Sequence, residues 1–178
     1  MTDTITPNEQ AEPEQPEQEL EDEQENMNGW RAFATLGQFL KDDDWYPQQL
    51  EGKTIYRVFF AGDNGELRCY AQIRIDLEQF IFYVIAPIKS PEEARDAIGE
   101  YINRANYGLR IGNFELDYND GEIRYKSSID FEYAALTPAL IKNAIYPAVH
   151  TMDRYLPGLL GVMYGNKTPQ QAIEDIEG

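Results

Sequence analysis

The chain has 178 residues, a net charge of −17 and 42% hydrophobic residues, which is enough for one domain with its own core. Its longest purely apolar runs are a few residues, far short of the ~20 that cross a bilayer. The N-terminal residues show neither the basic nor the apolar region of a signal peptide. The single cysteine, Cys69, excludes an internal disulfide. We therefore expect a cytoplasmic protein that does not bind membranes.

Acidic residues are concentrated at the N-terminal end. Residues 1–28 hold ten of the 32 acids and none of the 15 Lys and Arg residues, which leaves 22 acids against 15 bases in the rest of the chain. This segment has too few apolar residues to form a core, so we expect an acidic disordered tail over 1–28 and a single domain over 29–178. The tail either attracts a basic partner or keeps the protein soluble. The overall charge repels phosphate backbones and so disfavours DNA and RNA.

The first half of the domain predicts one helix and three strands. Apolar spacing indicates a helix over 29–41 that ends at or before three aspartates, because acids are unfavourable at a helix C-terminus. Alternating residues predict strands over 54–60, 66–75 and 79–87. Asp63-Asn64-Gly65 predicts a hairpin turn with positive φ angles between the first two strands. The third strand is apolar on both faces, which predicts cover on both sides.

The second half predicts a helix, two strands and two further helices. A capping box at Ser90 and an apolar stripe indicate an amphipathic helix, and strands follow over 110–118 and 122–131. The long helix that opens at Thr137-Pro138 contains two prolines, Pro147 and Pro157, which predict kinks or a break. Thr168 begins a final short helix. The order α-βββ-α-ββ-α predicts an α+β fold with an antiparallel sheet packed by helices.

The polar loops do not fit known ion or nucleotide sites. With Gly121 at position 6 of an EF-hand loop, Leu116 would occupy position 1 and Ser127 position 12, and neither is a suitable ligand there. The turn at Gly65 fails the same test. The glycines at 108 and 112 follow a helix, whereas phosphate-binding loops follow a strand and open a helix. These loops are therefore predicted to be hairpin and helix-end turns.

No residue set predicts catalysis either. His150 is the sole histidine, there is no G-x-S-x-G motif, and Cys69 lies on the inward side of its strand without an activating neighbour. The aspartates Asp42, Asp43 and Asp44 allow a metal hypothesis, but no histidine or distant carboxylate is evidently paired with them. We predict a non-enzymatic protein with no catalytic residue, no cofactor and no metal.

Two surfaces remain as binding candidates. The first is apolar: the segment YLPGLLGVMY is hydrophobic nearly all round, and with the aromatic pair before Pro47 it predicts either a buried terminal helix or an interface for a partner or a second copy. Its candidate residues are Trp45, Tyr46, Tyr155, Leu156, Leu159, Leu160, Met163 and Tyr164. The second is a basic and aromatic strand surface, which is typical of single-stranded RNA platforms but is interleaved with acids. Its residues are Arg57, Arg68, Tyr70, Arg74, Arg124 and Lys126.

Four stretches resemble the YbjN family, in particular its cyanobacterial branch. They read GKTIYRVFFAGDNGELRCYAQIRID (52–76), FYVIAPIKSPEE (82–93), RANYGLRIGNFELDYNDGEIRYKSSIDFE (104–132) and LTPALIKNAIYPAVHTMDRYLPGLL (136–160). The resemblance implies a fold similar to type III secretion chaperones and a role in sensory transduction regulation. Those chaperones are small acidic homodimers that bind extended segments of client proteins. It implies no catalytic residues.

The resemblance and the residues together give one expectation. The chain is expected to be a chaperone-like or regulatory protein, homodimeric, that binds an unidentified partner protein through apolar helix and sheet surfaces. An RNA-associated factor is the alternative, and it depends on the basic and aromatic strand surface.

Overall fold

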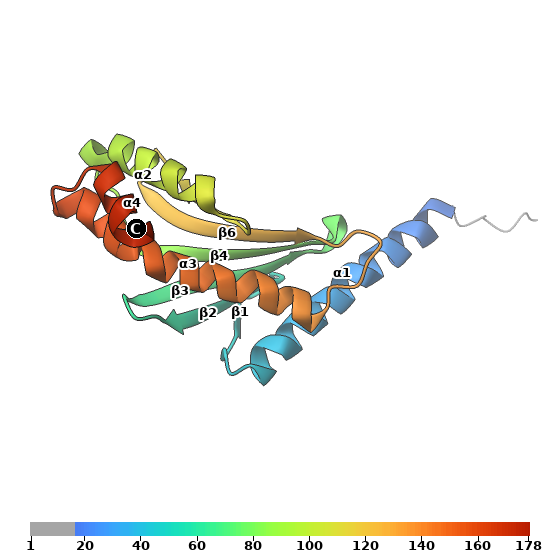
Figure 1. The fold of residues 1–178 in the computed structure, drawn as a ribbon. Helices are drawn as coiled ribbons and strands as arrows, with labels where there is room; N and C mark the ends of the chain where they lie inside the picture. Colours follow the sequence, from blue (N-terminus) through green and yellow to red (C-terminus); the bar gives the residue numbers. More distant parts are fainter. Residues whose placement is uncertain (1–16) are drawn as a thin grey trace, which may run out of the picture.

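The structure, a computed structural model, describes residues 17–178, with side chains from residue 27 onward. Figure 1 shows α3 running along a twisted sheet, with α2 and α4 at one end of the molecule and α1 at the other. The elements are α1 (Glu17–Asp42), β1 (Gln48–Gln49), β2 (Ile55–Ala61), β3 (Glu66–Arg74), η1 (Ile75–Leu77), β4 (Gln79–Lys89), η2 (Glu92–Ala94), α2 (Arg95–Gly108), β5 (Asn113–Leu116), β6 (Glu122–Asp130), α3 (Pro138–Tyr164) and α4 (Pro169–Glu177).

The sheet has the order β1-β2-β3-β4-β6-β5, and all of its neighbouring strands are antiparallel. This confirms the predicted α+β fold with the order α-βββ-α-ββ-α, to which the structure adds the two-residue strand β1 and two 3₁₀ turns. No helix within residues 17–178 is long and apolar enough to cross a membrane.

Helix α1 begins at Glu17, so it extends the helix predicted over 29–41 toward the N-terminus. Residues 17–28 are rich in Glu and Gln, which are good helix formers, and acids are favourable in the first turns of a helix. The helix ends at Asp42, as predicted. The remainder of the predicted tail, residues 1–16, lies outside the described residues.

One face of the sheet is buried and the other is not. Side chains alternate along the strands, and the buried set on one face includes Val58, Leu67, Cys69, Ala71, Ile73, Phe80, Phe82, Val84, Phe114, Ile123 and Tyr125. The helices contact the sheet through aromatic rings: Phe33 of α1 stacks on Tyr56 at 4.8 Å, and Tyr155 of α3 meets Phe114 edge-on at 5.6 Å. The core therefore lies between this face and the helices.

Strand β4 departs from the prediction of cover on both sides. Phe80, Phe82 and Val84 are fully buried, whereas Ile81, Tyr83 and Ile85 are only half-buried. The apolar residues on the second side are covered in part by long side chains of neighbouring strands, since the Arg124 guanidinium lies 4.5 Å from the centre of the Tyr83 ring. The expectation of full cover was wrong, and it leaves apolar surface on this strand.

Helix α3 runs through both of its prolines as one helix from Pro138 to Tyr164, so the predicted break does not occur. Proline at position 157 removes the helical hydrogen bond to the carbonyl of Asp153. That carbonyl instead accepts a hydrogen bond of 3.0 Å from the side-chain amide of Asn64, in the β2–β3 turn. A group from the sheet thus satisfies the carbonyl that Pro157 leaves free.

The Asp153 carboxylate holds the same turn. It accepts hydrogen bonds from the backbone N–H groups of Asp63 at 3.0 Å and Asn64 at 2.9 Å, and the residue is only 8% exposed. A Cβ atom on Gly62 would lie 2.2 Å from this carboxylate, so only glycine fits there. The hairpin was predicted correctly, but neither Asn64 nor Gly65 has the predicted positive φ, because the carboxylate fixes a different turn.

Two of the three predicted helix starts are confirmed. The Thr137 side chain accepts a hydrogen bond from the N–H of Leu140, and Thr168 forms a full capping box with Gln171. The capping box predicted at Ser90 is wrong: its hydroxyl donates to the carbonyl of Pro91, and the 3₁₀ turn η2 leads into α2 instead.

We expect Asp153→Ala to lower the free energy of unfolding by about 2–4 kcal/mol, because two partly buried N–H groups lose their charged acceptor. Urea denaturation followed by circular dichroism measures the change. The control is Asp63→Ala, which removes an exposed carboxylate from the same turn and should change stability by less than about 0.5 kcal/mol. Equal effects of the two substitutions would contradict the assigned role of Asp153.

Candidate protein interface

The predicted apolar interface is largely inside the core. Trp45, Tyr155, Leu156 and Leu159 are all buried, with exposed fractions between 0% and 8%. This corrects the expectation that they offer surface to a partner. For the three residues of α3 the reason is tertiary packing. Helices α2 and α4 both contact α3 and cover the sides of this helix that a single apolar stripe would leave exposed.

Specific contacts fix this part of α3. The Tyr101 hydroxyl of α2 donates to the carbonyl of Tyr155 at 2.9 Å, and a Cβ atom on Gly158 would lie 2.1 Å from that hydroxyl. The Tyr155 hydroxyl in turn donates to the Glu177 carboxylate of α4 at 2.5 Å. Tyr155 therefore joins α2, α3 and α4, and its role is to pack the helical layer.

The remaining members of the predicted set are accessible. Tyr46 is 81% exposed, Tyr164 is 64% exposed and Leu160 is 39% exposed, while Met163 is half-buried. Leu160, Met163 and Tyr164 lie together at the C-terminal end of α3, whereas Tyr46 follows α1. Only the first three can form one small apolar patch.

The strand surface predicted as the RNA alternative assembles on the side of the sheet opposite the helices. Cross-strand pairing places its side chains in two adjacent rows. The first row is Arg57, Tyr70, Tyr83 and Lys126, and the second is Phe59, Arg68, Ile85 and Arg124. We call these eight residues the open face. Arg74 lies on the same side, at the end of β3.

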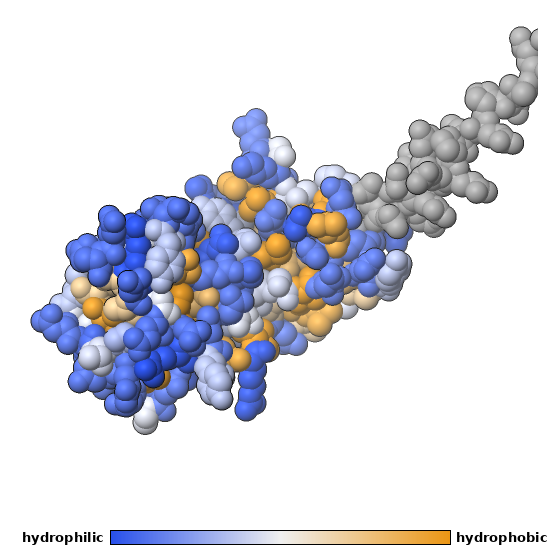
Figure 2. All heavy atoms as spheres, turned by 90° about the horizontal axis from the view of Figure 1, so that it is seen from above, coloured by the Kyte–Doolittle hydropathy of each residue, from blue (hydrophilic) through white to orange (hydrophobic). Residues whose placement is uncertain are grey.

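Sequence reasoning missed three members of the open face, namely Phe59, Tyr83 and Ile85. The available signal was the alternation of side chains along β2 and β4. Residues separated by an even number of positions in a strand lie on the same face, and this places all three on the outward face. Phe59 is 48% exposed, and the other two are half-buried. They give the open face an aromatic and aliphatic centre between its basic residues. In the view from above, Figure 2 shows hydrophobic residues in the middle of the molecule, next to a largely hydrophilic end that holds α2 and α4.

One acid pairs with both cations on the β6 side of the open face and offsets part of their charge. The Glu115 carboxylate of β5 accepts a hydrogen bond of 2.7 Å from Arg124 Nε and forms an ion pair with Lys126. Partial burial raises the pKa of Glu115, but the hydrogen bonds and charges of Lys126 and Arg124 outweigh it, so the pKa lies below its ordinary value of 4.5. This carboxylate is therefore ionised at neutral pH.

The β2–β3 side of the open face keeps its positive charge. No described carboxylate forms an ion pair with Arg57, Arg68 or Arg74. Arg57 Nη2 donates to the side-chain carbonyl of Gln48 at 2.7 Å, but its buried Nε has no hydrogen-bond partner among the described residues. The Arg68 guanidinium lies 5.9 Å from the centre of the Tyr70 ring. This arrangement can bind anionic groups beside aromatic surface.

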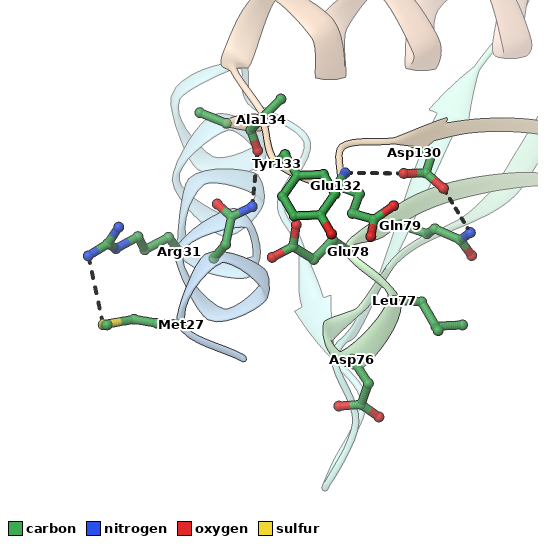
Figure 3. Close-up of a pocket in the computed structure, with 12 residues that line it drawn as sticks. Met27, Arg31, Asp76, Leu77, Glu78, Gln79, Asp130, Glu132, Tyr133 and Ala134 are labelled. Atoms are coloured by element: carbon green, nitrogen blue, oxygen red, sulfur yellow. Dashed lines mark hydrogen bonds between the residues drawn. The ribbon is translucent and has the colours of Figure 1, made fainter. Parts of the chain in front are cut away.

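A hollow with a volume of about 860 Å³ lies between α1 and the loop that follows β6. Figure 3 shows the carboxylates of Glu78 and Glu132 next to Tyr133 in this hollow. Asp130 accepts hydrogen bonds from the backbone N–H of Glu132 and from the Gln79 side chain, and these lower its pKa. These hydrogen bonds favour the ionised form of Asp130, which acts in this hollow as a hydrogen-bond acceptor.

The other chemical candidates have structural roles. Tyr146 and Trp45 both donate hydrogen bonds to Asp43, and the bond from Tyr146 lowers the pKa of its carboxyl. His150 stacks on Tyr146 at 6.0 Å, and Cys69 is fully buried, which raises the pKa of its thiol. Among residues 27–178, no group of three or more His, Cys, Asp or Glu side chains could hold a metal ion.

Comparison with known proteins shows two similar folds and then the family. The fold is similar to a solved structure described as "Crystal structure of YbjN, a putative transcription regulator from E. coli", with a TM-score of 0.54 and 12% identity over 68% of this chain and 85% of that chain. It is also similar to the "Structure of the HopA1-SchA Chaperone-Effector Complex", with a TM-score of 0.51 and 15% identity over 74% of this chain and 97% of that chain. At these identities the likeness concerns the fold alone.

Residues 33–161 match the YbjN family, which is described as a "Putative bacterial sensory transduction regulator". This chain belongs to the YbjN family. No curated protein matches the sequence.

We expect Glu115→Gln to lower the free energy of unfolding by about 1 kcal/mol at neutral pH, because two partly buried ion pairs are lost. The folded-state pKa of Glu115 is depressed, so its stabilisation is present above pH 4.5 and is lost as the pH falls through the folded-state pKa. The difference between wild type and variant should therefore narrow below pH 4.5. Urea titrations at about pH 7 and about pH 3.5 measure this.

The control for this prediction is Glu100→Gln. Glu100 pairs with Arg104 one turn away on exposed α2 surface, and such pairs contribute about 0.3–0.5 kcal/mol. A Glu115→Gln effect that is equal at both pH values would contradict the assigned ion pairs.

Proposed function

We propose that this protein is a non-enzymatic, chaperone-like or regulatory factor that binds an extended segment of a partner protein on its open face. The observation that supports this proposal best is the composition of that face. Tyr70 and Tyr83 are paired across neighbouring strands at its centre, with Phe59 and Ile85 beside them and arginines around them. Tyrosine and arginine are enriched at protein interfaces, where their large side chains anchor a partner.

The accessible apolar residues of β4 support the same proposal. A sheet with one solvated face normally places polar residues on that face. Here Ile81, Tyr83 and Ile85 are half-buried on it instead. Apolar side chains at every second position of a strand suit a partner segment that is itself extended and crosses the sheet. Membership of the YbjN family and the similarity of fold to a chain of a solved chaperone–effector complex are consistent with a protein ligand.

Single-stranded RNA is the alternative ligand of the same surface, because all six residues of the predicted RNA set lie on one side of the sheet. Two observations favour protein. Glu115 already pairs with Arg124 and Lys126 and offsets part of their positive charge, and residues 29–178 carry 22 acids against 15 bases, which opposes the approach of a phosphate backbone.

We expect the double substitution Tyr70→Ser/Tyr83→Ser to reduce partner recovery at least about tenfold, since interface tyrosines can contribute more than 1.4 kcal/mol each. The measurement is quantitative affinity purification from the native cells. The matched control is Tyr107→Ser/Tyr133→Ser, which alters two tyrosines that are 96% and 91% exposed and lie outside the open face. Circular dichroism and urea midpoints establish that all variants are folded.

Three results would contradict the proposal. Recovery of the same proteins by the wild type and the open-face variant would exclude the open face as the binding surface. Recovery of RNA that disappears with nuclease treatment and at high salt would favour the alternative ligand. A reaction catalysed by the purified protein would contradict the non-enzymatic role.

We further propose that the protein is a cytoplasmic homodimer joined through the exposed end of α3. Leu160, Met163 and Tyr164 form an accessible apolar patch there. We expect Leu160→Asp to shift the mass measured by light scattering from dimer to monomer, because a carboxylate would be buried without a partner. Leu140→Asp is the control, since Leu140 is also 39% exposed but lies at the opposite end of α3. A wild-type protein that is monomeric at all concentrations would refute the dimer.

A further inference from the structure

We propose that residues 1–16 of this chain bind its own open face and compete there with the partner segment. The inference rests on the proposed function, because it concerns the regulation of the same surface. Its starting observation is electrostatic: in a chain with a net charge of −17, Arg57, Arg68 and Arg74 lie on one side of β2 and β3 without a described ion-pair partner. An acidic ligand would neutralise them.

The N-terminal residues have the complementary chemistry. Residues 1–16 contain four acids, Asp3, Glu9, Glu12 and Glu14, and no Lys or Arg. The carboxylates can pair with these three guanidinium groups, whose hydrogen bonds within the described residues go to neutral glutamine side chains and not to acids. The same residues include three prolines, and proline-containing extended segments dock against aromatic side chains. The Tyr70–Tyr83 pair supplies such aromatic surface beside the arginines. Charge and aromatic surface therefore match the same segment.

The connection to α1 permits this contact. Helix α1 packs directly on η1, which follows β3, since a Cβ atom on Gly29 would lie 2.5 Å from the carbonyl oxygen of Ile75. From Gly29 back to Glu17 the helix spans about 18 Å. Sixteen extended residues reach about 50 Å. The segment must first run back along the length of helix between Glu17 and Gly29, which leaves about 30 Å of reach. Arg74, which lies on the same side of the sheet as the open face, is close to this point, since Trp30 of α1 and Arg74 of β3 line the same hollow.

The next distance is along β3. Arg74 and Arg68 are separated by about 20 Å of extended strand, which the remaining length covers. Individual exposed ion pairs are weak, but attachment to the same chain gives the segment an effective concentration in the range of about 1 mM. A free partner segment must therefore bind the open face tightly enough to displace the attached segment at this effective concentration. Salt should weaken the contact, because exposed charges are screened within about 8 Å at physiological ionic strength.

The experiment measures proximity directly in the full-length chain. A nitroxide is attached at Ile5→Cys, and its effect on the amide NMR signals of the ¹⁵N-labelled protein is recorded. Cys69 does not interfere, because it is fully buried and its thiol pKa is raised. We expect the signals of Arg68, Tyr70 and Arg74 to lose most of their intensity relative to the reduced nitroxide. Signals of α3 residues such as Lys142 should keep theirs.

Charge variants identify the surface responsible. Arg57→Glu/Arg68→Glu/Arg74→Glu should restore the open-face signals, as should high salt. The matched control, Lys41→Glu/Lys53→Glu/Lys142→Glu, makes the same charge change at three exposed residues outside the open face and should leave the broadening intact. Mixing unlabelled nitroxide protein with unmodified ¹⁵N-labelled protein should give no broadening, because the contact is within one chain.

Two results would overturn the inference: open-face signals that the nitroxide does not weaken, or broadening that survives in the arginine variant. Neither depends on partner binding. Deletion of residues 2–16 should raise partner recovery several-fold, whereas loss of recovery in Tyr70→Ser/Tyr83→Ser tests the proposed function by itself. If the nitroxide causes no broadening while Tyr70→Ser/Tyr83→Ser still loses partner recovery, the contact of residues 1–16 is rejected and the proposed function is not.

Discussion

The arrangement depends on one constraint, which is that the helices and the sheet share a single buried face. The aromatic contacts that join α1 and α3 to the strands are made with side chains that alternate onto this face, such as Tyr56 and Phe114. A six-stranded sheet has two faces, so one-sided packing leaves the other accessible. The surface available for recognition is therefore a direct consequence of how the core is built.

A buried carboxylate keeps the two layers in register. Asp153 of α3 accepts two N–H groups of the β2–β3 turn, and Asn64 of that turn satisfies the carbonyl freed by Pro157. Each polar group compensates another, so a proline in the middle of a helix and a carboxylate in the core are both accommodated. The contact joins residues about 90 positions apart and anchors the hairpin whose outer side carries Phe59 and Arg68.

The sequence was informative wherever a local rule decides the structure. Alternation in β3 identified Leu67, Cys69 and Ile73 as inward-facing residues, and the threonines before Pro138 and Pro169 identified two helix starts. It failed where distant segments decide. The segment from Tyr155 to Tyr164 allowed either a buried terminal helix or an interface, and only the positions of α2 and α4 show that Tyr155, Leu156 and Leu159 are covered. The turn at Asn64 was misjudged for the same reason.

Net charge is a poor guide to the binding chemistry of this protein, because charge is distributed unevenly in space. Ten of the 32 acids precede residue 29, and one glutamate, Glu115, pairs with two cations of the open face. The arginines of β2 and β3 have no ion-pair partner among the described residues, although the chain is strongly acidic. If the open face is the binding surface, as we propose, the net negative charge of the chain disfavours a long phosphate backbone more than a short segment with a few carboxylates.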